Sequence, residues 1–165
     1  MVEEHGLGPI KIKDFGLSGG YDPEDRSISL ESYEGAGEPG APSIMEVTGT
    51  NRHEIGHSVM HGSFEEVQRK EAQPGGYFLL EMEADLWAVA KTGGFDPMTL
   101  GGLVINYKGA ESNEGTGRAD ALLRKAVRAV NRKFGGEVLR FSSVKSVILS
   151  KAGRATEEYY KDVIF

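Results

Sequence analysis

The sequence has no cysteine among its 165 residues. This absence excludes disulfide scaffolds, thiolate zinc sites, cysteine-ligated iron–sulfur clusters and cysteine nucleophiles. No apolar run approaches the ~20 residues of a membrane-spanning helix, and the acidic N-terminal residues do not resemble a signal peptide. We therefore expect a cytoplasmic protein without membrane insertion. A transition-metal site in it would have to use mainly imidazole and carboxylate ligands.

Alternating apolar and polar residues indicate β-strands near the start of the chain. Residues 9–13 and residues 27–31 both show this alternation. The segment between them is dense in turn formers, so we expect the two strands to form an antiparallel hairpin. Residues 34–43 contain three glycines and two prolines and are expected to form a loop.

Helical periodicity and helix-end signals predict three or four helices in the rest of the chain. The predicted helices are one that ends near Gly62, one over about 76–91, a short one from Pro97 and one over 118–134. We expect residues 108–117 to form a mobile loop. The tail from Glu137 is predicted to be a strand or turn followed by a helix.

Three of the four histidines lie within nine residues, and two of them belong to an H-E-x-x-H motif, His53-Glu54-Ile55-Gly56-His57. On a helix, His53 and His57 are one turn apart with Cβ atoms ~6 Å from each other, so both imidazoles can bind one metal ion. Zinc makes water more acidic, and Glu54 projects beside the same face, where it can accept the proton. The alternative interpretation is an ordinary polar helix face, so the motif needs a third ligand.

The second predicted helix offers that ligand. Glu81 and Asp85 are four residues apart and share a helix face, and the small Ala84 and Ala88 beside them allow another helix to approach. Two such carboxylates repel each other unless a cation is near. If Glu81 binds the metal and Asp85 accepts the outer N–H of a ligand histidine, that repulsion is removed. Glu83 lies about 200° around the helix from Glu81 and is the weaker ligand candidate.

His61 is one turn beyond His57 but eight residues from His53, about 12 Å along a helix axis, so one metal ion cannot take all three. We expect His61 to support a ligand, to face the substrate, or simply to be favoured by the dipole at the helix C-terminus. A donor for a developing oxyanion is also expected. Its candidates are His61, Tyr107, Arg118, Tyr159 and Tyr160.

The strings HEIGHSVMH and EMEAD, with Glu81 24 residues after His57, resemble the gluzincin metallopeptidases. The ImmA/IrrE type is similar in its strand-then-helix lead-in and in its H-E-x-G-H with a further histidine. The HtpX type is similar in an E-x-x-A-D that runs into GFDP. The resemblance covers about residues 18–98. It implies zinc bound by His53, His57 and Glu81, with Glu54 as the general base and Asp85 as a partner of a ligand. The chain departs from the first type in having Asp85 where Asn is common, and from the second in lacking membrane helices.

We therefore predict one α+β, zincin-like domain over residues 1–165, a minimal gluzincin. A small antiparallel N-terminal sheet and loop (1–42) would pack on an active-site helix and a glutamate helix (43–107), followed by a C-terminal helical part (108–165). The predicted function is that of a zinc-dependent metalloendopeptidase acting on a peptide or protein substrate. Zinc would polarise the scissile carbonyl, and Glu54 would activate water. If residues 28–33 edge the sheet, they would align an extended substrate.

Two alternatives stay open at the level of sequence. One is a non-catalytic metal-binding module in which Glu54 is structural. The other is a DNA-associated regulatory protein, because residues 118–154 hold ten basic and two acidic side chains. The loop at 34–43 or the C-terminal tail would in addition be able to cover the cleft.

Overall fold

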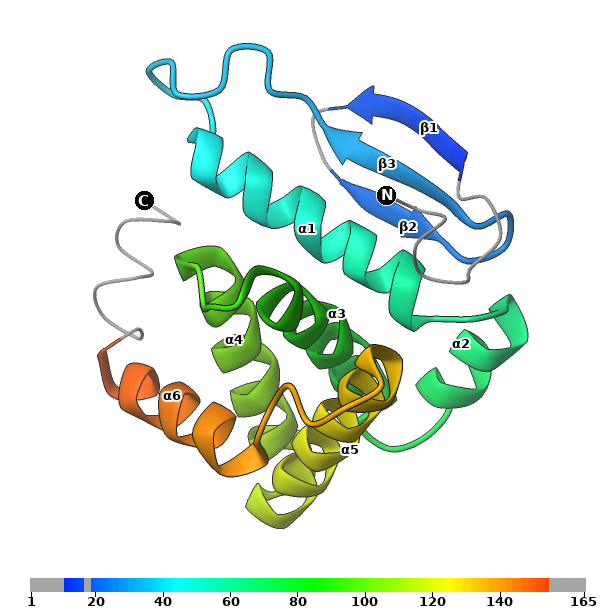
Figure 1. Ribbon diagram of the computed structural model, residues 1–165, viewed down its shortest axis with the longest axis vertical. Coiled ribbons are helices and arrows are strands. Elements are labelled where there is room, and N and C mark those ends of the chain that lie inside the picture. The colour runs from blue at the N-terminus through cyan, green and yellow to red at the C-terminus, as the bar shows by residue number, and fades with distance from the viewer. Residues whose placement is uncertain (1–10, 17–18, 155–165) are drawn as a thin grey trace.

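The fold places a three-stranded sheet and five further helices around helix α1 (Figure 1). The structure, a computed structural model, describes residues 11–16 and 19–154, and side chains from residue 19 to residue 150. The strands are β1 (Lys11–Gly16), β2 (Gly20–Asp22) and β3 (Ser27–Glu31), and the helices are α1 (Ile44–Met60), α2 (Phe64–Glu71), α3 (Gly76–Thr92), α4 (Pro97–Glu114), α5 (Thr116–Phe134) and α6 (Phe141–Arg154). The predicted α+β class, with an N-terminal sheet packed on the first helix, is confirmed. None of the described helices is long and apolar enough to cross a membrane.

The strand order β1-β3-β2 corrects the predicted hairpin. Residues 27–31 pair antiparallel with the short strand β2, whereas β1 lies on their other side and runs parallel to them. The side chains of Asp22 and Asp25 accept backbone N–H groups two residues further on, so the polar segment closes a tight turn after β2. Because β3 has a strand on each side, it is not an edge strand, and the condition for substrate alignment along residues 28–33 is not met. Residues 9–10 of the first predicted strand lie outside the described residues.

Side-chain hydrogen bonds fix the start of α1 and its place beneath the sheet. Residues 34–43 form a loop, as predicted, and the helix then begins with a capping box. The Ser43 hydroxyl accepts the Glu46 N–H, and the Glu46 carboxylate accepts the Ser43 N–H at 2.6 Å. Further along, Asn51 accepts the N–H of Glu31 at 2.6 Å and donates to its carbonyl at 3.0 Å. The end of β3 is thereby held against the middle of α1.

Helices α1 and α3 lie in backbone contact at Gly56. A Cβ atom added to this buried glycine would lie 2.5 Å from the carbonyl oxygen of Ala84, whose own side chain is fully buried. Helix α3 begins after Gly75 and ends before Gly93, and both of these glycines have the left-handed conformation. The helix is close to the predicted range of 76–91. The contact therefore sets the distance between the motif-bearing helix and the glutamate helix.

We expect Gly56→Ala to lower the free energy of unfolding by about 1–3 kcal/mol, because the added methyl group meets a backbone carbonyl and the helices must separate. Urea unfolding of the metal-free protein measures this. Gly117→Ala in α5 is the matched control: its Cβ would meet no atom within 4 Å, so the protein should be unchanged or stabilised by about 0.5–1 kcal/mol. Equal stability of Gly56→Ala and the wild type would contradict the close contact.

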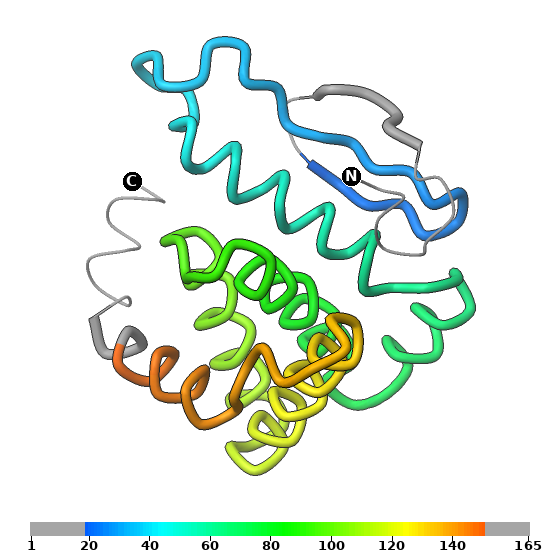
Figure 2. The backbone as a smooth tube through the Cα atoms, viewed as in Figure 1, coloured from blue at the N-terminus to red at the C-terminus, as the bar shows by residue number. Residues whose placement is uncertain are grey.

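The apolar core lies between α3 and the C-terminal helices, which Figure 2 shows following one another on the side of α1 opposite the sheet. The predicted mobile loop at 108–117 is wrong, since α4 continues to Glu114 and only Gly115 separates it from α5. A Cβ on Gly109 would lie 2.6 Å from the Phe78 ring, so this glycine permits close packing within a helix. The helix from Pro97 is therefore long, the helix over 118–134 is confirmed, and the tail after residue 137 forms a loop and then α6.

Candidate metal centre

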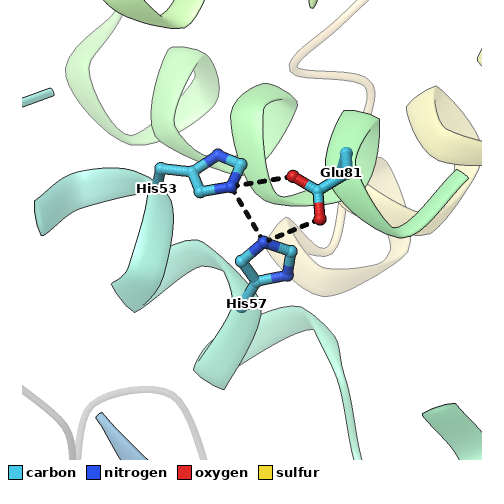
Figure 3. A group of neighbouring side chains, drawn as sticks. All are labelled: His53, His57 and Glu81. Carbon is cyan, nitrogen blue, oxygen red and sulfur yellow. Dashed lines mark hydrogen bonds and ion pairs between the residues drawn. The ribbon is translucent and has the colours of Figure 1, made fainter. Parts of the chain in front are cut away.

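Helices α1 and α3 bring His53, His57 and Glu81 together, as Figure 3 shows. The Nε2 atom of His53 lies 3.1 Å from one Glu81 oxygen, and the Nε2 atom of His57 lies 3.4 Å from the other. The two Nε2 atoms are 2.9 Å apart, and one ligand atom from each of the three residues lies within 4.8 Å of the others. The described residues thus include a His-His-Glu group that can bind a metal ion.

Asp85 orients the first histidine from outside this group. Its Oδ1 lies 2.8 Å from His53 Nδ1, so the imidazole can donate there and present the lone pair of Nε2 to a metal. The carboxylate is buried, and α4 closes over it, because a Cβ on Gly102 would lie 2.6 Å from Asp85 Oδ2. Asp85 and Glu81 therefore contact different ring nitrogens of His53.

The charges of the group favour a cation at its centre. Burial lowers the pKa of the His53 imidazole, but hydrogen bonds with Asp85 and Glu81 outweigh it and raise this pKa to about 10. Burial raises the pKa of Glu81, but its hydrogen bonds with the two histidines hold it well below its usual range. At neutral pH the metal-free group therefore holds a protonated His53 against a charged Glu81. A divalent ion would take the place of that proton.

The donor set fits zinc. Two neutral imidazole nitrogens and one carboxylate oxygen are the protein ligands of many catalytic zinc sites, with the fourth position left for water or substrate. The same donors also suit other divalent transition metals, so the geometry identifies a metal site without selecting the metal.

Glu54 lies in a pocket of about 280 Å³ that opens on the triad. It is not one of the three grouped ligands, and burial raises the pKa of its carboxyl. A Cβ on Gly19 would lie 2.8 Å from Glu54 Cγ, so the chain leading into β2 packs against this side chain. The remaining lining residues are Tyr21, Pro23, His53, His57, His61, Val67, Glu71, Leu80 and Glu81. Glu54 is thus next to the triad on the side that faces the sheet.

A second pocket, of about 320 Å³, adjoins the triad beside α4. It shares His53 and Glu81 with the first pocket and has Asp85 in its wall. Its other lining residues are Gly49, Thr50, Tyr77, Met98, Thr99, Gly101, Gly102, Ile105 and Asn106. The His-His-Glu group consequently lies between two pockets rather than at the end of one.

Of the predicted oxyanion donors that the structure describes, only His61 reaches the site. Its side chain is buried and lines the first pocket. Its Nδ1 atom is 3.1 Å from the Nδ1 atom of His57. The fully buried Tyr107 instead donates its hydroxyl to Asp120 at 2.7 Å, and Arg118 donates to the carbonyl of Pro74 at 2.9 Å. Neither residue lines either of the two pockets described above. Tyr159 and Tyr160 lie outside the described residues.

The structure adds three residues that sequence reasoning missed or set aside. The Tyr21 ring is parallel to the His57 ring, with centroids 6.5 Å apart. Glu83 is buried and pairs with Lys70 of α2 at 3.0 Å. Helix α2 was not predicted, although Ser63 followed three residues later by Glu66 is a helix-start signal, and the Ser63 hydroxyl does accept the Glu66 N–H.

The fold and the site define a mostly helical α+β protein whose His-His-Glu group can bind a metal ion. Comparisons with protein-family profiles, with curated proteins and with solved structures give no match to this chain. The function must therefore be argued from the site itself.

Proposed function

We propose that the protein is a zinc-dependent peptidase of the gluzincin kind, with His53, His57 and Glu81 as the metal ligands. The observation that carries this proposal is the position of Glu54. Glu54 lines the pocket beside the triad, while the three proposed ligands are other side chains. A merely structural metal site has no need of a further partly buried carboxylate at its open side.

Zinc held by His53, His57 and Glu81 would supply a Lewis acid for the scissile carbonyl and would lower the pKa of a water molecule toward ~7. Glu54 then acts as the general base: its carboxylate accepts a proton from the attacking water and passes it to the leaving amine. Burial raises the pKa of Glu54, which brings the carboxyl closer to the range in which it can both accept and return a proton. Asp85 holds His53 in the orientation that directs its Nε2 atom to the metal.

The two pockets support a substrate that extends on both sides of the metal position, as a peptide does. Strand β2 is at one edge of the sheet, and its residue Tyr21 lines the first pocket. An extended peptide would therefore add to the sheet along β2, rather than along the central strand β3. The cleaved bond would lie where the two pockets meet, beside His53 and Glu81.

Digestion of a peptide library tests the proposal. The full chain is loaded with zinc, its metal content is measured, and the products are read by mass spectrometry. We expect cleavage that stops when a chelator removes the zinc and returns when zinc is restored. Stoichiometric zinc without cleavage would instead favour a non-catalytic metal-binding protein, and failure to bind any divalent metal would contradict the metal centre itself.

A further inference from the structure

We infer that His61, Glu83 and Lys70 form a polar relay that positions His57 for metal binding. The inference rests on the metal centre of the proposed function and assigns roles to three residues that the proposal leaves unused. The relay runs from His61, which caps the end of α1, through Glu83 of α3 to Lys70 of α2.

The need for such a relay arises from the second ligand histidine. A histidine that binds a metal through one ring nitrogen usually donates the N–H of the other, which fixes its tautomer and its orientation. Asp85 is the partner of His53 in this sense. His57 directs Nε2 into the triad as His53 does, but its Nδ1 faces another imidazole, that of His61, at 3.1 Å.

Hydrogen-bond chemistry gives the relay a direction. His57 can bind a metal through Nε2 only if its own proton is on Nδ1, so the Nδ1 atom of His61 must be an acceptor. The proton of a neutral His61 is then on Nε2. That nitrogen is buried and lies 3.3 Å from a Glu83 oxygen, a distance that allows a hydrogen bond, although the angle in this conformation does not complete one. The carboxylate of Glu83 is the acceptor that this arrangement requires.

Lys70 makes a charged Glu83 tolerable in the interior. Glu83 is 2% exposed, and a buried carboxylate is costly without a paired cation. The Lys70 Nζ atom lies 3.0 Å from the same oxygen that faces His61, and it also pairs with Glu66 at the surface, at 3.6 Å. Gly76 allows this approach, because a side chain there would collide with the backbone of Lys70 at the end of α2.

Burial of an ion pair is a weak source of stability, and apolar residues often serve as well. A stabilising role alone therefore gives no reason for Glu83 to point at a histidine that itself contacts a ligand. The relay supplies that reason. It makes a specific prediction: what matters at position 61 is an acceptor for the His57 N–H, not the volume of the ring.

The test compares His61→Asn with His61→Leu. The Asn side-chain oxygen can take the place of the accepting Nδ1, whereas Leu fills space but cannot accept. In a chelator competition we expect the zinc Kd of His61→Leu to rise about 10–100-fold and that of His61→Asn to stay within about threefold of wild type. The visible spectrum of the cobalt-loaded protein should change in His61→Leu and be retained in His61→Asn, since it reports the ligand geometry at the metal.

A second pair of variants keeps the inference testable if His61→Leu does not fold. Glu83→Leu removes the acceptor for His61, and it should weaken zinc binding. Glu66→Leu removes the other carboxylate on Lys70 and should not. Equal zinc affinity of folded His61→Leu, His61→Asn and wild type would overturn the relay, as would equal weakening of the two His61 variants or equal affinity of the Glu83 and Glu66 variants. These outcomes leave the peptidase proposal standing, whereas a wild type that binds no zinc overturns both.

Discussion

Replacing Glu54 by Gln should leave zinc bound and slow peptide cleavage by about 10²–10⁴-fold, the usual contribution of a general base. Glutamine has the same shape, so the packing against Gly19 is preserved. Its amide cannot accept the proton of the attacking water. Because the proposed ligands are His53, His57 and Glu81, the metal should be retained at wild-type stoichiometry.

The measurement is kcat/KM on a peptide that the library identifies, together with the zinc content of each protein. Glu65→Gln is the matched control, because Glu65 is exposed on α2 and lines neither of the two pockets. We expect its activity to be close to that of wild type. Full activity of Glu54→Gln would rule out the mechanism, and loss of zinc from that variant would show that Glu54 is a ligand.

The sequence predicts those features of the site that depend on the geometry within a single helix. A spacing of four residues places His53 above His57, and Glu81 above Asp85, whatever the rest of the chain does. To predict that these two helix faces form one site, it was enough to find small residues where the helices can pack against each other. Ala84 indicated that contact, and the structure places Gly56 of α1 directly against it.

The remaining contacts depend on how separate helices and strands pack against one another. The periodicity of the sequence does not specify that packing. Glu83 is two residues from Glu81 and faces away from the triad, so its role depends on the unpredicted helix that carries Lys70. Tyr107 has the chemistry of an oxyanion donor, but α4 directs it into the core toward Asp120. The strands show the same limit, because alternation predicts that residues 27–31 are β without saying which strand lies on each side.

Glu81→Ala should have the largest effect on the metal itself. Only two imidazoles would remain, and zinc in proteins is ordinarily held by three or four protein ligands. We therefore expect the zinc Kd to rise by more than the roughly 10–100-fold that the loss of an outer partner costs. Chelator competition and elemental analysis of the full chain measure this change.

The electrostatics give a reason for expecting more than the loss of one bond. Glu81 is the carboxylate that faces both histidines. One of its oxygens lies near the Nε2 atom of His53 and the other near the Nε2 atom of His57. Its removal leaves Asp85 as the remaining hydrogen-bonded carboxylate of His53, on the far side of the ring from the metal position. Glu71→Ala serves as the control, since it removes a carboxylate from the pocket but not from the triad. If Glu81→Ala bound zinc as tightly and in the same amount as that control, the third ligand would have to be another residue, and Glu81 would be a partner of the histidines alone.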